Sequence, residues 1–402
     1  MMDLLGARVV GPLESHAAGF AEHLERLGYT LATRRQHMTL VAHLSRWLAR
    51  GGLDAAGLTV AVARRYIQAR AAAGYRAFRS RRSLDPLLSY LRGVGAAPDE
   101  PPIVLTTADA LLERFRTYLL TERGLRPNVV TFYVLSVRPF VSTVVVGDAT
   151  NVANLSARAV TAFLSDLARS LAPKTVQGRA SALRALLRFW FLDGVTSVDL
   201  SMSVPKVAHR SSGLPKGLPA EQVTALLASC DTHSANGLRD LAILTMLARM
   251  GLRSGEVAGL QLDDLDWRQG EVVVHGKGGH LDRLPLPADV GQVLADYLRS
   301  GRPAGALDRR VFVRVKAPHR GLTNTAVTQV VNAAAHRAGL GTIYAHRLRH
   351  SAATTMLAAG APLAEIGQVL RHRSALTTSI YAKVDIGALR GLAMPWPQEV
   401  DR

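Results

Sequence analysis

The chain has 402 residues, of which 48% are hydrophobic, so it is long enough for two or three domains and too apolar for wholesale disorder. No apolar run approaches the ~18 residues that a membrane span needs, and the N-terminus lacks the layout of a secretory signal. We therefore expect an intracellular protein with no membrane partner. Cys230 is the single cysteine, which excludes an intrachain disulfide, and we interpret it as a small core residue.

The charge of the chain is the first indication of function. Lysine and arginine number 49 against 31 acidic residues, a formal net charge of +18, and most of these cations are arginine. Arginine grips phosphates with a planar fork, so the composition favours a polyanionic partner, DNA or RNA rather than a membrane surface. A GC-rich genome would also produce an excess of arginine and alanine, which leaves a compositional explanation open.

The first part of the chain, residues 15–95, has the pattern of several amphipathic helices. The spacing of apolar residues predicts a helix through His43, a second helix near Val62–Ala71 and a basic helix from Tyr75 to Leu91. A proline-rich break, Pro98–Pro102, separates this block from the next.

Residues 107–200 repeat this order of elements at an offset of roughly 96 residues. Helices are expected at Tyr133–Val141, Ala157–Leu167 and Pro173–Phe191. The sequence match between the two blocks is weak but their order of elements is the same, so duplication of one helical unit is a hypothesis.

The last expected helix of each block is strongly basic, and its cations are candidates for DNA contact: Arg76, Arg79, Lys174, Arg179 and Arg184. A charged helix face is usually only solvated surface. Faces of one sign on successive blocks instead suit a track of phosphates.

Three domains are expected from the breaks in the pattern. Residues 206–218 are polar, basic and interrupted by glycine and proline, which is typical of a linker. The expected parts are an N-terminal helical block at 1–100, a second helical domain at 106–205 and a C-terminal domain at 214–402.

Arg253 is the first candidate for chemistry. An amphipathic helix is expected at Asn236–Met250, with Gly251 ending it and Ser254 starting another helix as its N-cap. Arg253 then lies in a tight turn between two helices, where Glu256 is near enough to pair with it and to fix its orientation.

A β-hairpin carries the second candidate. Two apolar runs, Glu271–His275 and Leu281–Leu286, flank a glycine-rich turn and predict a hairpin with Lys277 at its tip. From this position a lysine can reach into a neighbouring groove. A nucleotide-binding P-loop is excluded, because five residues separate Gly270 from Gly276 and no serine or threonine follows the lysine.

The remaining candidates lie near the end of the chain. A helix is expected from Tyr344 to Gly360, and it places His346 and Arg349 on one face. A further helix, Leu363–Leu370, is followed shortly by His372, and Tyr381 comes nine residues later.

These strings resemble the signature of the tyrosine recombinase, or integrase, family: Gly251-Leu252-Arg253-Ser254-Gly255-Glu256, His346-Arg347-Leu348-Arg349-His350 and Leu370-Arg371-His372, followed by Tyr381. The resemblance covers residues 214–390 strongly, and residues 107–205 resemble the family's core-binding, SAM-like domain more weakly. Carried over position by position, it implies a catalytic set of Arg253, Lys277, His346, Arg349, His372 and Tyr381.

The implied roles agree with the chemistry of phosphodiester cleavage. The two arginines would clamp the nonbridging phosphate oxygens, so neither a metal nor any other cofactor is expected. Tyr381 would form a covalent phosphotyrosine that conserves the bond energy, and Lys277 would protonate the departing 5′ oxygen. His346 would assist proton transfer at the tyrosine, and His372 would hydrogen-bond the phosphate.

Two features of the C-terminal part need separate mention. Arg371 departs from the family pattern, which usually has glycine before the second histidine, and adds a bulky cation beside the pocket. A short helix is expected at Asp385–Ala393. The resemblance implies that this tail helix docks into a neighbouring subunit, and packing onto its own domain is the alternative.

We therefore expect a mainly α fold with a small antiparallel β-sheet, in which helical DNA-binding domains accompany an α-rich catalytic domain. The resemblance implies a site-specific recombinase that joins double-stranded DNA sites for integration, excision or transposition of a mobile element. It further implies a homo-oligomer, a tetramer when two sites are paired, with other recombinases as further candidate partners. Such a protein would work in the cytoplasm, associated with the nucleoid.

Three other interpretations compete with this one. A DNA-binding protein that has lost the chemistry is disfavoured by the intact set of six residues. A type IB topoisomerase shares the tyrosine chemistry, but the extra helical block and the C-terminal tail favour recombination. A metal site at His346 and His350 lacks an acidic residue or a third histidine at suitable spacing.

Overall fold

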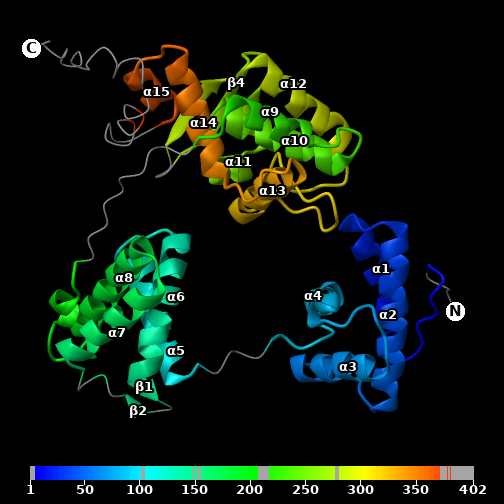
Figure 1. Ribbon diagram of the computed structural model, residues 1–402. Helices are drawn as coiled ribbons and strands as arrows, with labels where there is room; N and C mark the ends of the chain where they lie inside the picture. The colour runs from blue at the N-terminus through cyan, green and yellow to red at the C-terminus, as the bar shows by residue number, and fades with distance from the viewer. Residues whose placement is uncertain are drawn as a thin grey trace, which may run out of the picture. The chain divides into compact units, whose positions relative to one another are not determined.

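The computed structural model describes residues 5–100, 105–146, 149–150, 152, 155–206, 217–276, 280–371, 378 and 381 (Figure 1). The fold is mainly α-helical with a small antiparallel sheet, which confirms the expected fold class. The chain divides into two compact units: residues 101–212 form one, and residues 1–100 with 213–402 form the other.

The N-terminal block has a hydrophobic cluster of its own. Its elements are η1 (Glu14–His16), α1 (Ala17–Arg26), α2 (Leu31–Arg50), α3 (Val60–Ala72), η2 (Arg81–Ser83) and α4 (Asp85–Gly93). Thr30 and Thr59 start α2 and α3 as N-caps, because each side-chain oxygen accepts a hydrogen bond from a backbone N–H three residues later. Phe20, Met38 and Leu88 bring α1, α2 and α4 into one core.

The basic helix expected from Tyr75 to Leu91 is wrong in its first half. α3 ends before Gly74, which has a φ of +80°, and Phe78 has a φ of +56°, so a right-handed helix cannot continue through this segment. Only the second half is helical, as α4. Arg76 and Arg79 therefore lie on an irregular, exposed segment rather than on a helix face.

Residues 105–206 form the second helical block. Its elements are α5 (Thr107–Thr121), α6 (Pro127–Val144), β1 (Val145–Val146), β2 (Ala149–Thr150), α7 (Ala157–Ser170), α8 (Pro173–Leu192) and η4 (Leu200–Ser203). Phe115, Phe140 and Trp190 are fully buried and bring α5, α6 and α8 into one core. The three helices that the sequence predicted in this block are confirmed.

The two helical blocks keep the offset that the sequence indicated. α2 begins at Leu31 and α6 at Pro127, while α3 begins at Val60 and α7 at Ala157. The last helices differ, because α8 is long whereas α4 is short. Duplication of one unit stays a hypothesis.

The C-terminal region is built around α10. Its elements are α9 (Ala220–Ala228), α10 (Ala235–Arg249), α11 (Ser254–Gly259), η5 (Leu262–Asp264), β3 (Leu265–Asp266), β4 (Glu271–His275), β5 (Leu281–Pro285), α12 (Ala288–Asp296), η6 (Tyr297–Gly301), α13 (Asn324–Arg337), α14 (Ala345–Ala358) and α15 (Leu363–Val369). Ile243, Leu244 and Leu247 of α10 are completely buried, and α9, α11, α12, α13 and α14 surround this helix (Figure 1). Cys230 is buried in the same core, as expected.

The small sheet has the order β3-β4-β5, with all pairs antiparallel. Val272 and Val274 of β4 point into the core, and β4 pairs with β5 from Glu271↔Pro285 to His275↔Leu281, so the predicted hairpin is confirmed.

Several predictions fall outside the described residues: most of the linker at 206–218, Lys277, His372 and the tail helix at Asp385–Ala393. Among the helices that the structure does describe, none has both the length and the apolar character needed to cross a membrane.

Candidate active site

The turn between α10 and α11 positions Arg253. Gly251 follows α10 with a φ of +60°, a left-handed conformation that suits glycine. A Cβ atom at this position would lie 2.5 Å from Leu370 Cδ2, so the buried Leu370 side chain would have to shift to admit any other residue. The residue that caps α11 is Arg253 and not Ser254, which corrects the expected helix start by one residue.

Glu256 pairs with Arg253, as the sequence indicated. Its Oε1 accepts a hydrogen bond from Arg253 Nη1 at 2.7 Å, and its Oε2 accepts one from the Arg253 backbone N–H at 2.8 Å. The Arg253 side chain is 44% exposed and that of Glu256 only 6%, so the guanidinium can meet a ligand while its partner stays buried. Burial alone would raise the pKa of Glu256, but the hydrogen bonds from Arg253 and the charge of Arg371 outweigh it and lower this pKa.

Arg349 joins this turn from α14. Its side chain is buried, with Nη1 donating to the carbonyl of Gly251 and Nη2 to the carbonyl of Leu370. Burial, and then the positive charge of Arg253, lower its pKa to about 10, so it is still protonated at neutral pH. The two arginines form one cationic site.

Tyr381 packs against α14 and is 1% exposed, in a small apolar cluster with Ile366 and Leu370. Its hydroxyl lies 2.8 Å from His350 Nδ1, within hydrogen-bond distance. Burial raises the pKa of the Tyr381 hydroxyl, and the positive charge of Arg349 opposes this effect. A buried phenol therefore lies beside both a base and a cation.

His350 is the residue that sequence reasoning missed, because His346 was expected to act on the tyrosine. His346 is exposed, stacks on Tyr344 and meets the His350 ring edge-on at a centroid distance of 5.8 Å. Burial, and then the charges of His346 and Arg349, lower the pKa of His350, so its ring is neutral at neutral pH. The signal available in the sequence was its place one helical turn after His346.

Arg371 lies beside the arginine pair, as its position in the sequence suggested. Its φ is +53°, and its side chain, 7% exposed, donates from Nη2 to Glu256 Oε2 at 2.7 Å. Two arginines thus share one carboxylate. Of the six expected catalytic residues, the structure places four around α14 and the α10–α11 turn: Arg253, His346, Arg349 and Tyr381.

The expected DNA-contact residues differ in their surroundings. Lys174 is exposed at the start of α8 and Arg179 is partly buried. Arg184 donates to the backbone carbonyls of Val204 and Pro205 at 3.0 and 3.3 Å, so its guanidinium has a structural use within its own block.

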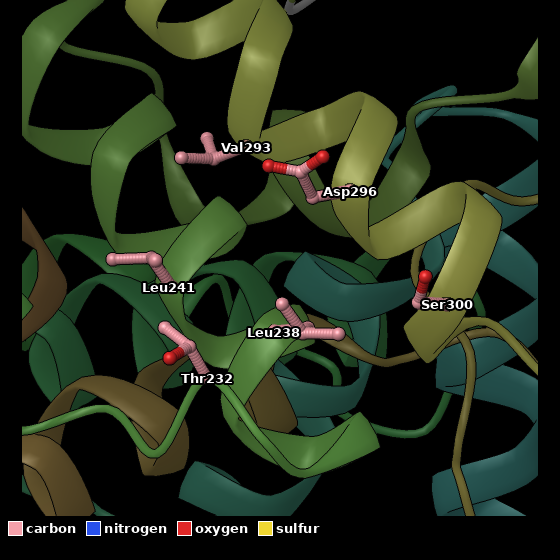
Figure 2. Close-up of a pocket in the computed structure, with 6 residues that line it drawn as sticks. All are labelled: Thr232, Leu238, Leu241, Val293, Asp296 and Ser300. Carbon is pink, nitrogen blue, oxygen red and sulfur yellow. The ribbon is translucent and has the colours of Figure 1, made fainter.

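A separate pocket of about 300 Å³ lies on α10, α12 and η6 (Figure 2). Leu238, Leu241 and Val293 form its apolar part, and Thr232, Asp296 and Ser300 its polar part. None of the four expected catalytic residues that the structure describes lines this pocket, so it is not the site of the arginine pair.

Comparison with known families identifies the chain. The Phage integrase family matches residues 216–387, and the Phage integrase, N-terminal SAM-like domain matches residues 112–193. A putative integrase/recombinase y4rA of Sinorhizobium fredii is 37% identical over 395 residues, which are 97% of this chain and 96% of the relative. Tyrosine recombinase XerD of Listeria monocytogenes is 33% identical over 281 residues, 68% of this chain and 94% of the relative. The chain belongs to the phage integrase family and is a tyrosine site-specific recombinase.

The fold agrees with this membership. The structure of the XerH site-specific recombinase bound to its difH substrate superposes with a TM-score of 0.56 at 20% identity, over 74% of this chain and 99% of that chain.

Proposed function

We propose that Arg253 and Arg349 bind the nonbridging oxygens of the scissile phosphate and that Tyr381 is the nucleophile. The observation that carries this assignment is the hydrogen bond between the Tyr381 hydroxyl and His350, on the same helix that supplies Arg349. Arg349 in turn bonds to the turn that bears Arg253. One rigid framework therefore holds a nucleophile and two phosphate ligands.

The reaction then needs no external energy source. The Tyr381 oxygen attacks phosphorus and forms a 3′-phosphotyrosine while the bond to the 5′ oxygen breaks. The arginines stabilise the charge that grows on the nonbridging oxygens, and Lys277 gives the proton that the 5′ oxygen takes up. In the reverse step a 5′ hydroxyl of the partner strand attacks the phosphotyrosine, and Tyr381 leaves with a proton.

We assign the proton acceptor of Tyr381 to the histidine pair on α14. The neutral His350 ring lies at hydrogen-bond distance from the phenol and can receive its proton. His346, whose ring meets the His350 ring edge-on, is proposed to stabilise the positive charge that His350 gains with this proton. His372 is proposed as a hydrogen-bond donor to the phosphate.

The proposed partner is a double-stranded recombination site in the DNA of the nucleoid. Exchange between two duplexes cuts four strands, and each subunit contributes one tyrosine, so the working assembly would be a tetramer. We propose that the tail helix at Asp385–Ala393 joins neighbouring subunits. The XerH structure, which contains that protein's DNA substrate, supports DNA as the partner.

We further propose that three domains share the DNA: residues 1–100, 106–205 and 214–402. Each has a separate hydrophobic cluster, which supports this division. Five of the eight arginines between Ala61 and Gly95 are exposed, and the match to the Sinorhizobium relative extends over nearly the whole chain. Arg76 and Arg79 on the N-terminal block, and Lys174 and Arg179 on the next, would contact phosphates.

The decisive experiment traps the covalent intermediate. A site is first selected from random-sequence DNA by binding to the wild-type protein, and it is then nicked next to the cleavage position so that the released strand diffuses away. Wild type should accumulate a protein–DNA adduct and Tyr381→Phe none, with DNA affinity nearly intact. Arg349→Ala should form the adduct ~100-fold more slowly or worse.

The same material separates the rival functions. Relaxation of supercoiled plasmid without the selected site would indicate a topoisomerase. Binding without any adduct from wild type would indicate a DNA-binding protein that lacks the chemistry. Adducts that persist in Tyr381→Phe would overturn the assignment of the nucleophile.

A further inference from the structure

Arg371 combines two features that are each unfavourable for arginine. Its φ of +53° is a left-handed conformation in which any side chain is strained and glycine is not. Its side chain is only 7% exposed, although arginine is rarely buried unless it is paired. Glycine at this position would avoid both, so the guanidinium must make interactions that glycine cannot.

Those interactions lead to the phosphate site. Arg371 Nη2 donates to Glu256 Oε2 at 2.7 Å, and Arg371 Nη1 donates to the carbonyl of Val369 at 3.1 Å. The backbone carbonyl of Arg371 lies 3.4 Å from Arg253 Nη2. Side chain and backbone of one residue therefore reach both Arg253 and the carboxylate that orients it.

The sharing of Glu256 decides how Arg253 is held. A carboxylate with a single arginine partner favours a two-pronged pair that occupies both terminal nitrogens of the guanidinium. Here Glu256 Oε2 is occupied by Arg371 and by the Arg253 backbone N–H, so only Arg253 Nη1 bonds to Oε1. Arg253 Nη2 is left with one long bond to a carbonyl, and it can turn to a phosphate.

A second carboxylate connects Arg371 to the hairpin. Asp282 lies on β5, and its Oδ2 is 3.9 Å from Arg371 Nε. This distance is too long for a hydrogen bond, so the ion pair links Arg371 to the hairpin by charge alone, and β5 pairs with β4 along its whole length. Arg371 thus links α11 and β5, both of which lie between Arg253 and Arg349 in the sequence.

We propose that Arg371 is a positioning residue for recombination. Its hydrogen bond to Glu256 Oε2 leaves only Oε1 to the Arg253 side chain, which keeps Arg253 Nη2 available to the phosphate. Its ion pair with Asp282 holds strand β5 beside the site. The proposal rests on the assignment of Arg253 as a phosphate ligand. It differs from a purely structural role, because it places the effect of Arg371 on the cleavage step rather than on folding or on DNA affinity.

The test uses the full chain and the nicked DNA substrate under single-turnover conditions at saturating protein. Arg371→Gln and Arg371→Gly should both slow adduct formation by about 10- to 100-fold, the range for residues that orient functional side chains, with little change in DNA affinity. The glycine variant removes the backbone strain as well, so it stays folded even if the glutamine variant does not. Arg371→Lys keeps the charge and should recover part of the rate.

Two further variants localise the effect. Arg283 lies on β5 beside Asp282 and forms an exposed ion pair with Glu271. Arg283→Gln should therefore cleave at the wild-type rate. Glu256→Gln should slow wild type strongly but add little to Arg371→Gln, because Arg371 is proposed to act on Arg253 through Glu256.

Wild-type rates for both Arg371→Gln and Arg371→Gly would overturn the proposal. The proposal would also be overturned if the Arg371 variants lost rate only in proportion to a lower melting temperature, and if their effect on the rate were fully additive with that of Glu256→Gln. Adduct formation by Tyr381→Phe would instead contradict the proposed function. If Tyr381→Phe is inactive while Arg371→Gln and Arg371→Gly are both fully active, the positioning role of Arg371 is refuted and the proposed nucleophile stands.

Discussion

Gly251→Ala is expected to damage both the stability and the activity of the recombinase. The left-handed φ of +60° costs a non-glycine residue ~1–2 kcal/mol. The new Cβ would lie 2.5 Å from Leu370 Cδ2, and forcing a methyl group into such a packed contact costs a further ~1–3 kcal/mol. Together these terms predict a loss of about 2–5 kcal/mol in the free energy of unfolding.

The loss of activity should exceed what unfolding explains. The carbonyl of Gly251 accepts a hydrogen bond from Arg349, so relief of the clash with Leu370 should shift Arg349, the proposed phosphate ligand. We expect adduct formation by the folded fraction to fall by about tenfold or more, as when an active-site donor is misplaced.

The assay is urea unfolding of the full chain, with hydrogen exchange of α10 and α11 to locate the change. Gly255→Ala is the matched control, because its Cβ would meet no described atom within 4 Å beyond its own helix backbone and chain neighbours, and alanine is favoured inside α11. If Gly251→Ala unfolds within about 0.5 kcal/mol of wild type, the size of an ordinary surface change, and cleaves normally, the reasoning from φ and contact is refuted.

Three further predictions follow from the site and the charged surfaces. Because arginines supply the countercharge, cleavage should proceed in excess chelator, and activity that vanishes in chelator and returns with magnesium would contradict this reading. Burial and nearby cations lower the pKa of His350, so the cleavage rate should be level around neutral pH and fall only below the ordinary histidine range as the ring gains a proton. His350→Gln should lower the plateau of the rate and remove this decline at acidic pH. An unchanged pH profile in His350→Gln would exclude His350 as the proton acceptor of Tyr381. Removing Arg76 and Arg79 together should flatten the dependence of log affinity on log salt by about 0.9 per lost phosphate contact, whereas Arg81→Gln, whose partner is Glu100, should leave the slope nearly unchanged.

The secondary structure around the site could be predicted because its signals are local. Gly251 marks the end of α10, and the apolar spacing of residues 345–358 marks α14. The error at Tyr75–Leu91 has a local cause as well. The left-handed Phe78 interrupts the helix, and nothing in the composition of that segment marks a phenylalanine for such a conformation.

The contacts of the proposed catalytic side chains were harder to predict from the sequence. Glu256 could be paired with Arg253 because they lie three positions apart at the start of one helix. The contact of His350 with Tyr381 was not predicted, since those residues are 31 positions apart and the resemblance assigned the role beside the tyrosine to His346. Arg371 was noted as a cation near the pocket, but its bonds to Glu256 span 115 positions.

The sequence by itself determined the class of the protein and indicated which groups to propose as reactive, because a chemistry that needs two arginines and a tyrosine restricts residue type and order. Only the tertiary structure decided which groups meet. Glu256 and Arg371 come from distant segments, and their contact depends on how α11 and the end of α15 come together in the fold. Packing of this kind follows from the shape of the whole core, for which spacing along the chain carries no signal.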